Sequence, residues 1–123
     1  MKFIHLSCIF LFAFTLSAQE HSLSEHRWKH RIILIDVTDQ SDVYIEQKNI
    51  LSSDKEGVDE RKLVLCSAQE WKLDQKVKGI LKEYKTVLIG LDGGVKMRSN
   101  KCFTLEELYT EIDKMPMRRW EIE

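Results

Sequence analysis

The stretch Arg31-Ile-Ile-Leu-Ile-Asp-Val37 decides the fold of this chain. It is a continuous apolar run with several β-branched residues, which is typical of a strand buried on both faces of a sheet. The chain has 123 residues, 43% hydrophobic and 32% charged, enough for one small domain and unlike a disordered tail or a polytopic membrane protein. A formal net charge of −1 also argues against nucleic-acid binding, which usually requires a strongly basic face.

Apolar periodicity predicts alternating helices and strands after this strand. The expected strands after the first one cover residues 62–67, 86–90 and 95–98, and the last two form a hairpin. Three helices are expected from apolar stripes at helical spacing. The stripes are Val43, Gln47, Ile50 and Leu51; then Leu73, Val77, Ile80, Leu81 and Tyr84; and then Leu105, Leu108, Tyr109, Ile112 and Met115. Residues 52–61 are expected to form a polar loop with Gly57 as its hinge. Thr104 and Glu107 form a capping box for the last helix, and Pro116 is expected to end it.

The order of these elements predicts an α/β fold with a four-stranded mixed sheet. A right-handed crossover places the strands at 31–37 and 62–67 parallel and adjacent. The hairpin must then join on the other side of the first strand, because that strand reads as central. The predicted strand order is 2-1-3-4 with helices on both faces, the minimal thioredoxin-like arrangement, over a domain of residues 31–123.

Residues 1–18 have the layout of a secretory signal peptide. Lys2 precedes a nearly unbroken apolar run over 8–14, and Ala18 is a small residue at the expected cleavage site. The run is shorter than the roughly 20 residues of a transmembrane helix, and Cys8 lies too early to be a lipidated cysteine. We therefore expect a secreted or periplasmic protein with no membrane span after cleavage.

Residues 19–30 are polar, and we expect a flexible leader that docks near Trp28. Its side chains include the one metal-like cluster of the sequence, formed by His21, His26, His30, Glu20 and Glu25. Two of these imidazoles would share one face of a helix, but a mobile segment has no fixed geometry or supporting contacts for a metal. We interpret it as a solvated leader, with adventitious zinc or copper binding as the alternative, and predict no metal site and no cofactor.

The cysteines do not fit a thioredoxin-type oxidoreductase, which needs a thiolate in the turn after the first strand. That turn, Val37-Thr-Asp-Gln-Ser-Asp42, carries only hydroxyl, carboxyl and amide groups. Cys66 is expected to be a small core residue of an apolar strand. Cys102 follows Lys101 and precedes the Thr104 cap, so we expect a positive local field there and either a reactive thiol or an ordinary loop cysteine. In the predicted order the two cysteines lie ~14 Å apart, beyond the ~7 Å limit for bridged Cα atoms, so no disulfide is expected.

The chain resembles, over residues 27–121, a bacterial family of domains of unknown function. The segments that carry the likeness are Leu88-Ile-Gly-Leu-Asp-Gly-Gly-Val-Lys-Met-Arg98, Ile112-Asp-Lys-Met-Pro-Met-Arg-Arg119, Glu121 and the strand at 31–36. The same domain occurs in extracellular vertebrate proteins such as Equarin and the sushi-repeat proteins, where it is called peroxiredoxin-like. The resemblance implies a thioredoxin-like fold, secretion and no established catalytic activity. The family usually has lysine where this chain has Leu91.

The resemblance also points to a binding surface, because its most specific motifs cluster in two segments. The residues expected to form that surface are Asp92, Lys96, Arg118 and Arg119. The alternative for the two arginines is structural, since they follow the last helix and would neutralise its carbonyl end or pair with nearby carboxylates.

The resulting functional hypothesis is a secreted or periplasmic, non-catalytic thioredoxin-like module that binds an unknown protein or envelope partner. The alternative is a thiol-dependent, peroxiredoxin-like redox protein that uses Cys102.

Overall fold

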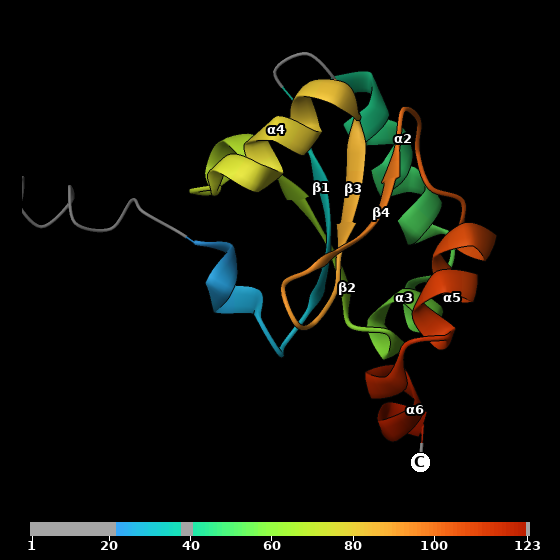
Figure 1. Cartoon of the computed structure of the whole chain (residues 1–123). Coiled ribbons are helices and arrows are strands. Elements are labelled where there is room, and N and C mark those ends of the chain that lie inside the picture. Colours follow the sequence, from blue (N-terminus) through green and yellow to red (C-terminus); the bar gives the residue numbers. More distant parts are fainter. Residues whose placement is uncertain (1–21, 38–40, 123) are drawn as a thin grey trace, which may run out of the picture.

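A computed structural model describes residues 22–37 and 41–122 of the chain (Figure 1). Its elements in chain order are η1 (Leu23–His26), β1 (Arg31–Ile35), α2 (Ser41–Ser52), α3 (Lys55–Glu60), β2 (Leu63–Ser67), η2 (Ala68–Glu70), α4 (Gln75–Glu83), β3 (Thr86–Ile89), β4 (Val95–Ser99), α5 (Leu105–Asp113) and α6 (Pro116–Ile122), where η marks a 3-10 helix. The predicted signal peptide, His21 and residues 38–40 of the turn after β1 lie outside the described residues. Within the described part, no helix is both long and apolar enough to cross a membrane.

The strands form one mixed sheet in the order β2-β1-β3-β4, which confirms the predicted α/β fold and topology. β1 pairs parallel to β2, with Ile33 opposite Leu65, and antiparallel to β3, with Ile33 opposite Leu88. β3 and β4 form the predicted antiparallel hairpin. The strand β1 is central and buried along its whole length, as its apolar sequence predicts.

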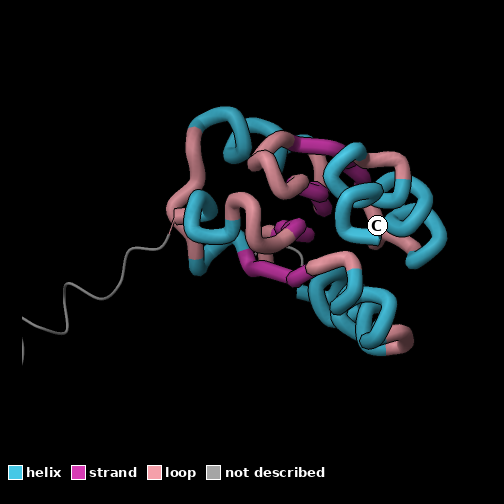
Figure 2. Tube along the Cα trace, turned by 90° about the horizontal axis from the view of Figure 1, so that it is seen from below, coloured by secondary structure: helices cyan, strands magenta, loops and turns pink. Residues whose placement is uncertain are grey.

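The two faces of β1 belong to two separate cores, because successive side chains of a strand point to opposite sides. Ile33 and Ile35 pack with residues from α2, α3 and α5. Ile32 and Leu34 pack with Cys66 and with residues from α4. Helices therefore cover both faces of the sheet, as predicted, and the view from below in Figure 2 shows them on either side of the strands.

The polar loop predicted over 52–61 is instead the short helix α3. Asp54 is its N-cap and accepts a hydrogen bond from the backbone N–H of Gly57. A Cβ at Gly57 would lie 2.7 Å from the hydroxyl oxygen of Tyr109, so this glycine gives room for a contact with α5 and is not a hinge. The sequence hides this helix because Val58 is its only buried residue.

Pro116 does not end the last helix, as the sequence had predicted, but begins another one. α5 ends at Asp113, and Pro116 opens a further helix, α6. Proline suits the first turn of a helix, where its missing N–H would have no intrahelical partner. The capping box of Thr104 and Glu107 at the start of α5 is confirmed.

Residues 22–30, which belong to the expected leader, lie against the sheet from Ser22 onward. Leu23 packs against the core that contains Ile32, and the backbone N–H of Trp28 donates to the carbonyl of Leu91 at 2.7 Å. Trp28 has φ +70°, an unusual conformation for a bulky residue. The packed part of the molecule therefore begins before the predicted domain start at Arg31.

Candidate functional site

A pocket of about 210 Å³ opens where the β3–β4 turn faces the corner between α5 and α6. Its lining consists of Arg31, Leu91, Asp92, Lys96, Glu111, Met115, Pro116 and Met117. These residues come from three separate parts of the chain, and only the tertiary structure brings them together. The pocket combines an apolar wall with four charged side chains.

The turn supplies one wall of this pocket and holds Asp92 and Lys96 in place. The Lys96 Nζ lies 3.0 Å from Asp92 Oδ2, and Asp92 Oδ1 accepts a hydrogen bond from the backbone N–H of Gly94 at 2.9 Å. That backbone hydrogen bond and the lysine lower the pKa of Asp92, which favours its carboxylate form. A Cβ at Gly90 would approach Lys96 Cε to 2.7 Å, so glycine there leaves room for the lysine stem.

Arg31, the first residue of β1, lines the pocket and is fully buried. Its Nη1 donates to the carbonyl oxygen of Arg61 at 2.8 Å and to Glu121 Oε1 at 3.0 Å. Glu121 also pairs with Lys62, at 3.3 Å. A buried cation needs such partners to offset its lost hydration.

The α5–α6 corner contributes Met115, Pro116 and Met117 to the apolar lining, and the β3–β4 turn contributes the buried Leu91. Methionine side chains are flexible and polarisable, so they adapt to the shape of an apolar ligand. Glu111 of α5 also lines the pocket, and within the described part of the chain it has neither a hydrogen bond nor an ion pair. Among the described lining residues, Glu111 is the charged side chain that has no hydrogen bond and no ion pair.

The arginines predicted for the binding surface have different roles. Arg118 is buried, with its Nη2 2.8 Å from Glu60 Oε1 and its Nε 3.3 Å from Asp113 Oδ1. Burial opposes its charge, but hydrogen bonds to Glu60 and Asp113 raise the pKa of Arg118. Arg118 thus pairs with nearby carboxylates, as in the structural alternative, whereas Arg119 is exposed on α6 and is not among the described residues that line the pocket.

The structure brings the predicted Asp92 and Lys96 together. The same pocket is lined by Arg31, Glu111 and two methionines, which the sequence analysis did not place on this surface. The signal for Arg31 was a charged residue directly before an apolar run. Met115 lies beyond the end of α5 and is half-buried. It packs against the core, as its place in the predicted stripe indicates, and it also lines the pocket.

Comparison with known proteins identifies the family of this chain. It matches the family described as "Domain of unknown function (DUF4174)" over residues 22–121. The chain belongs to this family. The matched region of the DUF4174 domain contains every residue of the pocket lining. Searches of curated proteins and of solved structures found no match.

Both cysteines of the folded DUF4174 domain are free and buried. Cys102 lies against the first turns of α2, where its Sγ donates to the carbonyl of Val43 at 3.2 Å and lies 3.4 Å from Glu46 Oε2. Burial, and then the hydrogen bond to Glu46, raise the pKa of Cys102 to about 11. The expected positive field at this cysteine is therefore wrong, because the carboxylate of Glu46 dominates it.

Cys66 is a core residue of β2, as predicted. Burial raises the pKa of this thiol to about 11 as well. Since a thiolate is the nucleophilic form, neither cysteine of the DUF4174 domain has the environment of a reactive thiol at neutral pH.

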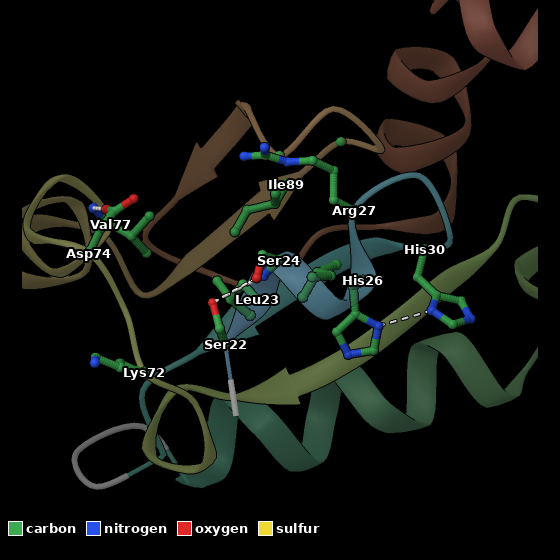
Figure 3. Close-up of a pocket in the computed structure, with 13 residues that line it drawn as sticks. Ser22, Leu23, Ser24, His26, Arg27, His30, Lys72, Asp74, Val77 and Ile89 are labelled. Atoms are coloured by element: carbon green, nitrogen blue, oxygen red, sulfur yellow. Dashed lines mark hydrogen bonds between the residues drawn. The ribbon is translucent and has the colours of Figure 1, made fainter. Parts of the chain in front are cut away.

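A second, smaller pocket of about 150 Å³ lies beside η1 (Figure 3). Here His26 Nδ1 and His30 Nδ1 are 2.9 Å apart, and the His26 ring packs 4.8 Å from the ring of Trp71. Burial and the neighbouring His30 lower the pKa of His26. Residues 22–37 and 41–122 contain no group of three side chains placed to hold a metal ion. His21, a member of the predicted cluster, lies outside these described residues.

Proposed function

We propose that this protein is a non-catalytic, thioredoxin-like binding module that holds a segment of a partner protein in the pocket between the β3–β4 turn and the α5–α6 corner. One observation carries the proposal. Two separate segments of the chain, within residues 91–96 and 111–117, meet there and line a pocket with charged and apolar side chains. Pockets that combine apolar walls with a few placed polar groups are typical binding sites.

The lining supports binding rather than a covalent reaction. Lys96 is held by Asp92, and Arg31 is held by Glu121, so these groups are already oriented before a ligand arrives. No cysteine, serine, threonine or histidine is among the described residues that line this pocket. Cys66 and Cys102 are buried thiols, and their pKa values are raised. A thiol with a raised pKa has little thiolate at neutral pH, which disfavours the redox alternative.

We further propose that the module acts outside the cytoplasm, as a secreted or periplasmic protein. The signal-peptide layout of residues 1–18 supports export, with cleavage after Ala18. Mass spectrometry of the protein from the native culture tests this directly. A chain that begins at Gln19 in the extracellular or periplasmic fraction is expected, and an uncleaved chain in the cytoplasm would contradict export.

Site-specific cross-linking tests the binding function. A photoreactive phenylalanine analogue at Met117, on the pocket, is compared with the same analogue at Ile45, an exposed apolar residue of α2 outside the pocket. We expect a discrete partner adduct only from position 117, and its loss in the double variant Asp92→Lys/Lys96→Asp, which reverses both charges.

The recovered partner is then purified and its affinity for the wild-type protein and the double variant is measured by calorimetry. A drop in affinity of tenfold or more, about 1.4 kcal/mol, is the expected result. Equal cross-linking from both positions, or equal affinity of the double variant, would contradict the assignment of the pocket.

A further inference from the structure

We propose that the pocket recognises a carboxylate on a short apolar stem, the C-terminal residue of a peptide, through the unpartnered edge of Arg31. This inference rests on the proposed function and specifies the chemistry of the bound segment. It starts from Arg31, whose buried guanidinium uses only part of its hydrogen-bonding capacity.

The two hydrogen bonds of Arg31 both come from Nη1, to Arg61 and to Glu121. Its Nε is buried without a hydrogen-bond partner. The hydrogen bonds that the side chain makes to described residues come from Nη1 and leave Nη2 unused. Because the side chain is 1% exposed, these donors are shielded from bulk water, and the pocket that Arg31 lines is the space next to it. An unmet donor in such a place costs free energy that a suitable acceptor would recover.

The free edge has the chemistry of a carboxylate receptor. Nε–H and Nη2–H of a guanidinium point in parallel and match the two oxygens of a carboxylate in a bidentate pair. Such pairs are stronger when they form away from water. The ammonium of Lys96, another lining residue, adds positive charge, although Asp92 partly neutralises it.

The unpaired Glu111 narrows the choice of ligand. The carboxylate of Glu111 in the pocket lining repels a purely anionic ligand such as inorganic phosphate. It favours a ligand that carries a donor next to its own carboxylate, because the donor N–H would pair with Glu111. The C-terminal residue of a peptide has this arrangement, with its amide N–H one carbon away from the carboxylate.

The apolar wall accounts for the stem of the ligand. Leu91, Met115 and Met117 would contact the last side chain of the peptide, and a leucine or methionine fits the adaptable surface that two methionines provide. The volume of about 210 Å³ suits one residue and its terminal groups rather than a long segment.

Nuclear magnetic resonance of the arginine Nε–H groups tests this inference on the wild-type protein. The probes are N-acetyl-L-leucine, its amide, and the α-amide of N-acetyl-L-aspartic acid (hereafter N-acetyl-L-aspartamide), which has only a side-chain carboxylate. We expect the Arg31 Nε–H signal to shift with N-acetyl-L-leucine, saturating with a Kd on the order of millimolar. The signal of the exposed Arg119 is the internal control and should not move.

The other two probes give the opposing outcomes. The amide should leave the Arg31 signal in place, and an equal shift with the amide would overturn the role of the carboxylate. A larger shift with N-acetyl-L-aspartamide would overturn the assignment to a C-terminus. No shift with any probe would overturn the inference, while a partner cross-linked at Met117 would still support the proposed function.

Variants separate recognition from folding. Arg31→Lys keeps the charge and removes the parallel donors, so we expect at least a tenfold loss of affinity for N-acetyl-L-leucine. Because Arg31 is buried, Met117→Glu serves as a second variant that places a negative charge at the half-buried wall, with Met117→Leu as its matched control. We expect a tenfold loss with glutamate and little change with leucine, and equal binding by both would contradict the pocket as the site.

Discussion

Gln47 and Phe103 exchange two hydrogen bonds in the interior of the molecule. The Gln47 Nε2 donates to the Phe103 carbonyl at 3.0 Å, and its Oε1 accepts from the Phe103 N–H at 2.8 Å. The side chain of Gln47 thus satisfies both backbone hydrogen-bonding groups of Phe103, just before α5, as a neighbouring strand would do. Both residues are almost fully buried, so α2 and the start of α5 are joined where water does not compete.

Replacing Gln47 with leucine should destabilise the protein by about 2–3 kcal/mol, because a buried N–H and a buried carbonyl of Phe103 would lose their partners. Urea denaturation measures the change in the free energy of unfolding. The matched control is Gln75→Leu, at an exposed position of α4, with an expected change within about 0.5 kcal/mol. Equal effects of the two substitutions would show that the Gln47 hydrogen bonds add nothing to stability.

The neighbouring arginines of α6 should respond differently to the same substitution. Arg118→Met should lower the free energy of unfolding by about 1–2 kcal/mol, since the buried guanidinium joins α6 to Glu60 and Asp113, whose own carboxylates are about half exposed. Arg119→Met should change it by no more than about 0.5 kcal/mol, because Arg119 is exposed. Thermal and urea denaturation provide the measurement. A larger loss at Arg119 than at Arg118 would contradict the ion-pair network.

Stability should fall at alkaline pH through Tyr109. Burial, and then its hydrogen bond to Asp54 at 2.8 Å, raise the pKa of Tyr109 to about 12 from an ordinary value of 10.0. A raised pKa means that the stabilisation is complete below pH 10 and is lost as the pH rises towards 12. Ultraviolet titration of tyrosinate should therefore show a late-ionising group that Tyr109→Phe removes. Tyr44, whose pKa is also raised by burial, should still ionise late in that variant. A wild-type titration that completes near the ordinary tyrosine pKa would refute the contact.

Cys102 should react slowly with alkylating reagents at neutral pH. A pKa of about 11, compared with the ordinary 9.0, lowers its thiolate fraction by about 100-fold. Iodoacetamide labelling followed by mass spectrometry measures the rate, with the urea-unfolded protein as the reference. Glu46→Gln should speed the labelling of Cys102, because it removes the carboxylate that disfavours the thiolate. Fast labelling of the folded protein together with peroxide consumption that Cys102→Ser abolishes would instead support the redox alternative.

The sequence alone determined the sheet. The apolar run of β1 requires burial on both faces, and a buried central strand leaves one place for the parallel partner and another for the hairpin. The capping box at Thr104 and the core position of Cys66 follow from local patterns in the same way. These features depend on periodicity and on neighbours within a few residues, which a sequence displays directly.

Only the tertiary structure decided the short helices and the pocket. α3 buries a single residue and α6 begins at a proline, so neither has an apolar period that reveals it. The role of Arg31 depends on Arg61 and on Glu121, which is 90 residues away in the sequence. Contacts over such separations arise from packing, because the energy that holds a buried charge comes from the groups the fold brings to it and not from its neighbours along the chain.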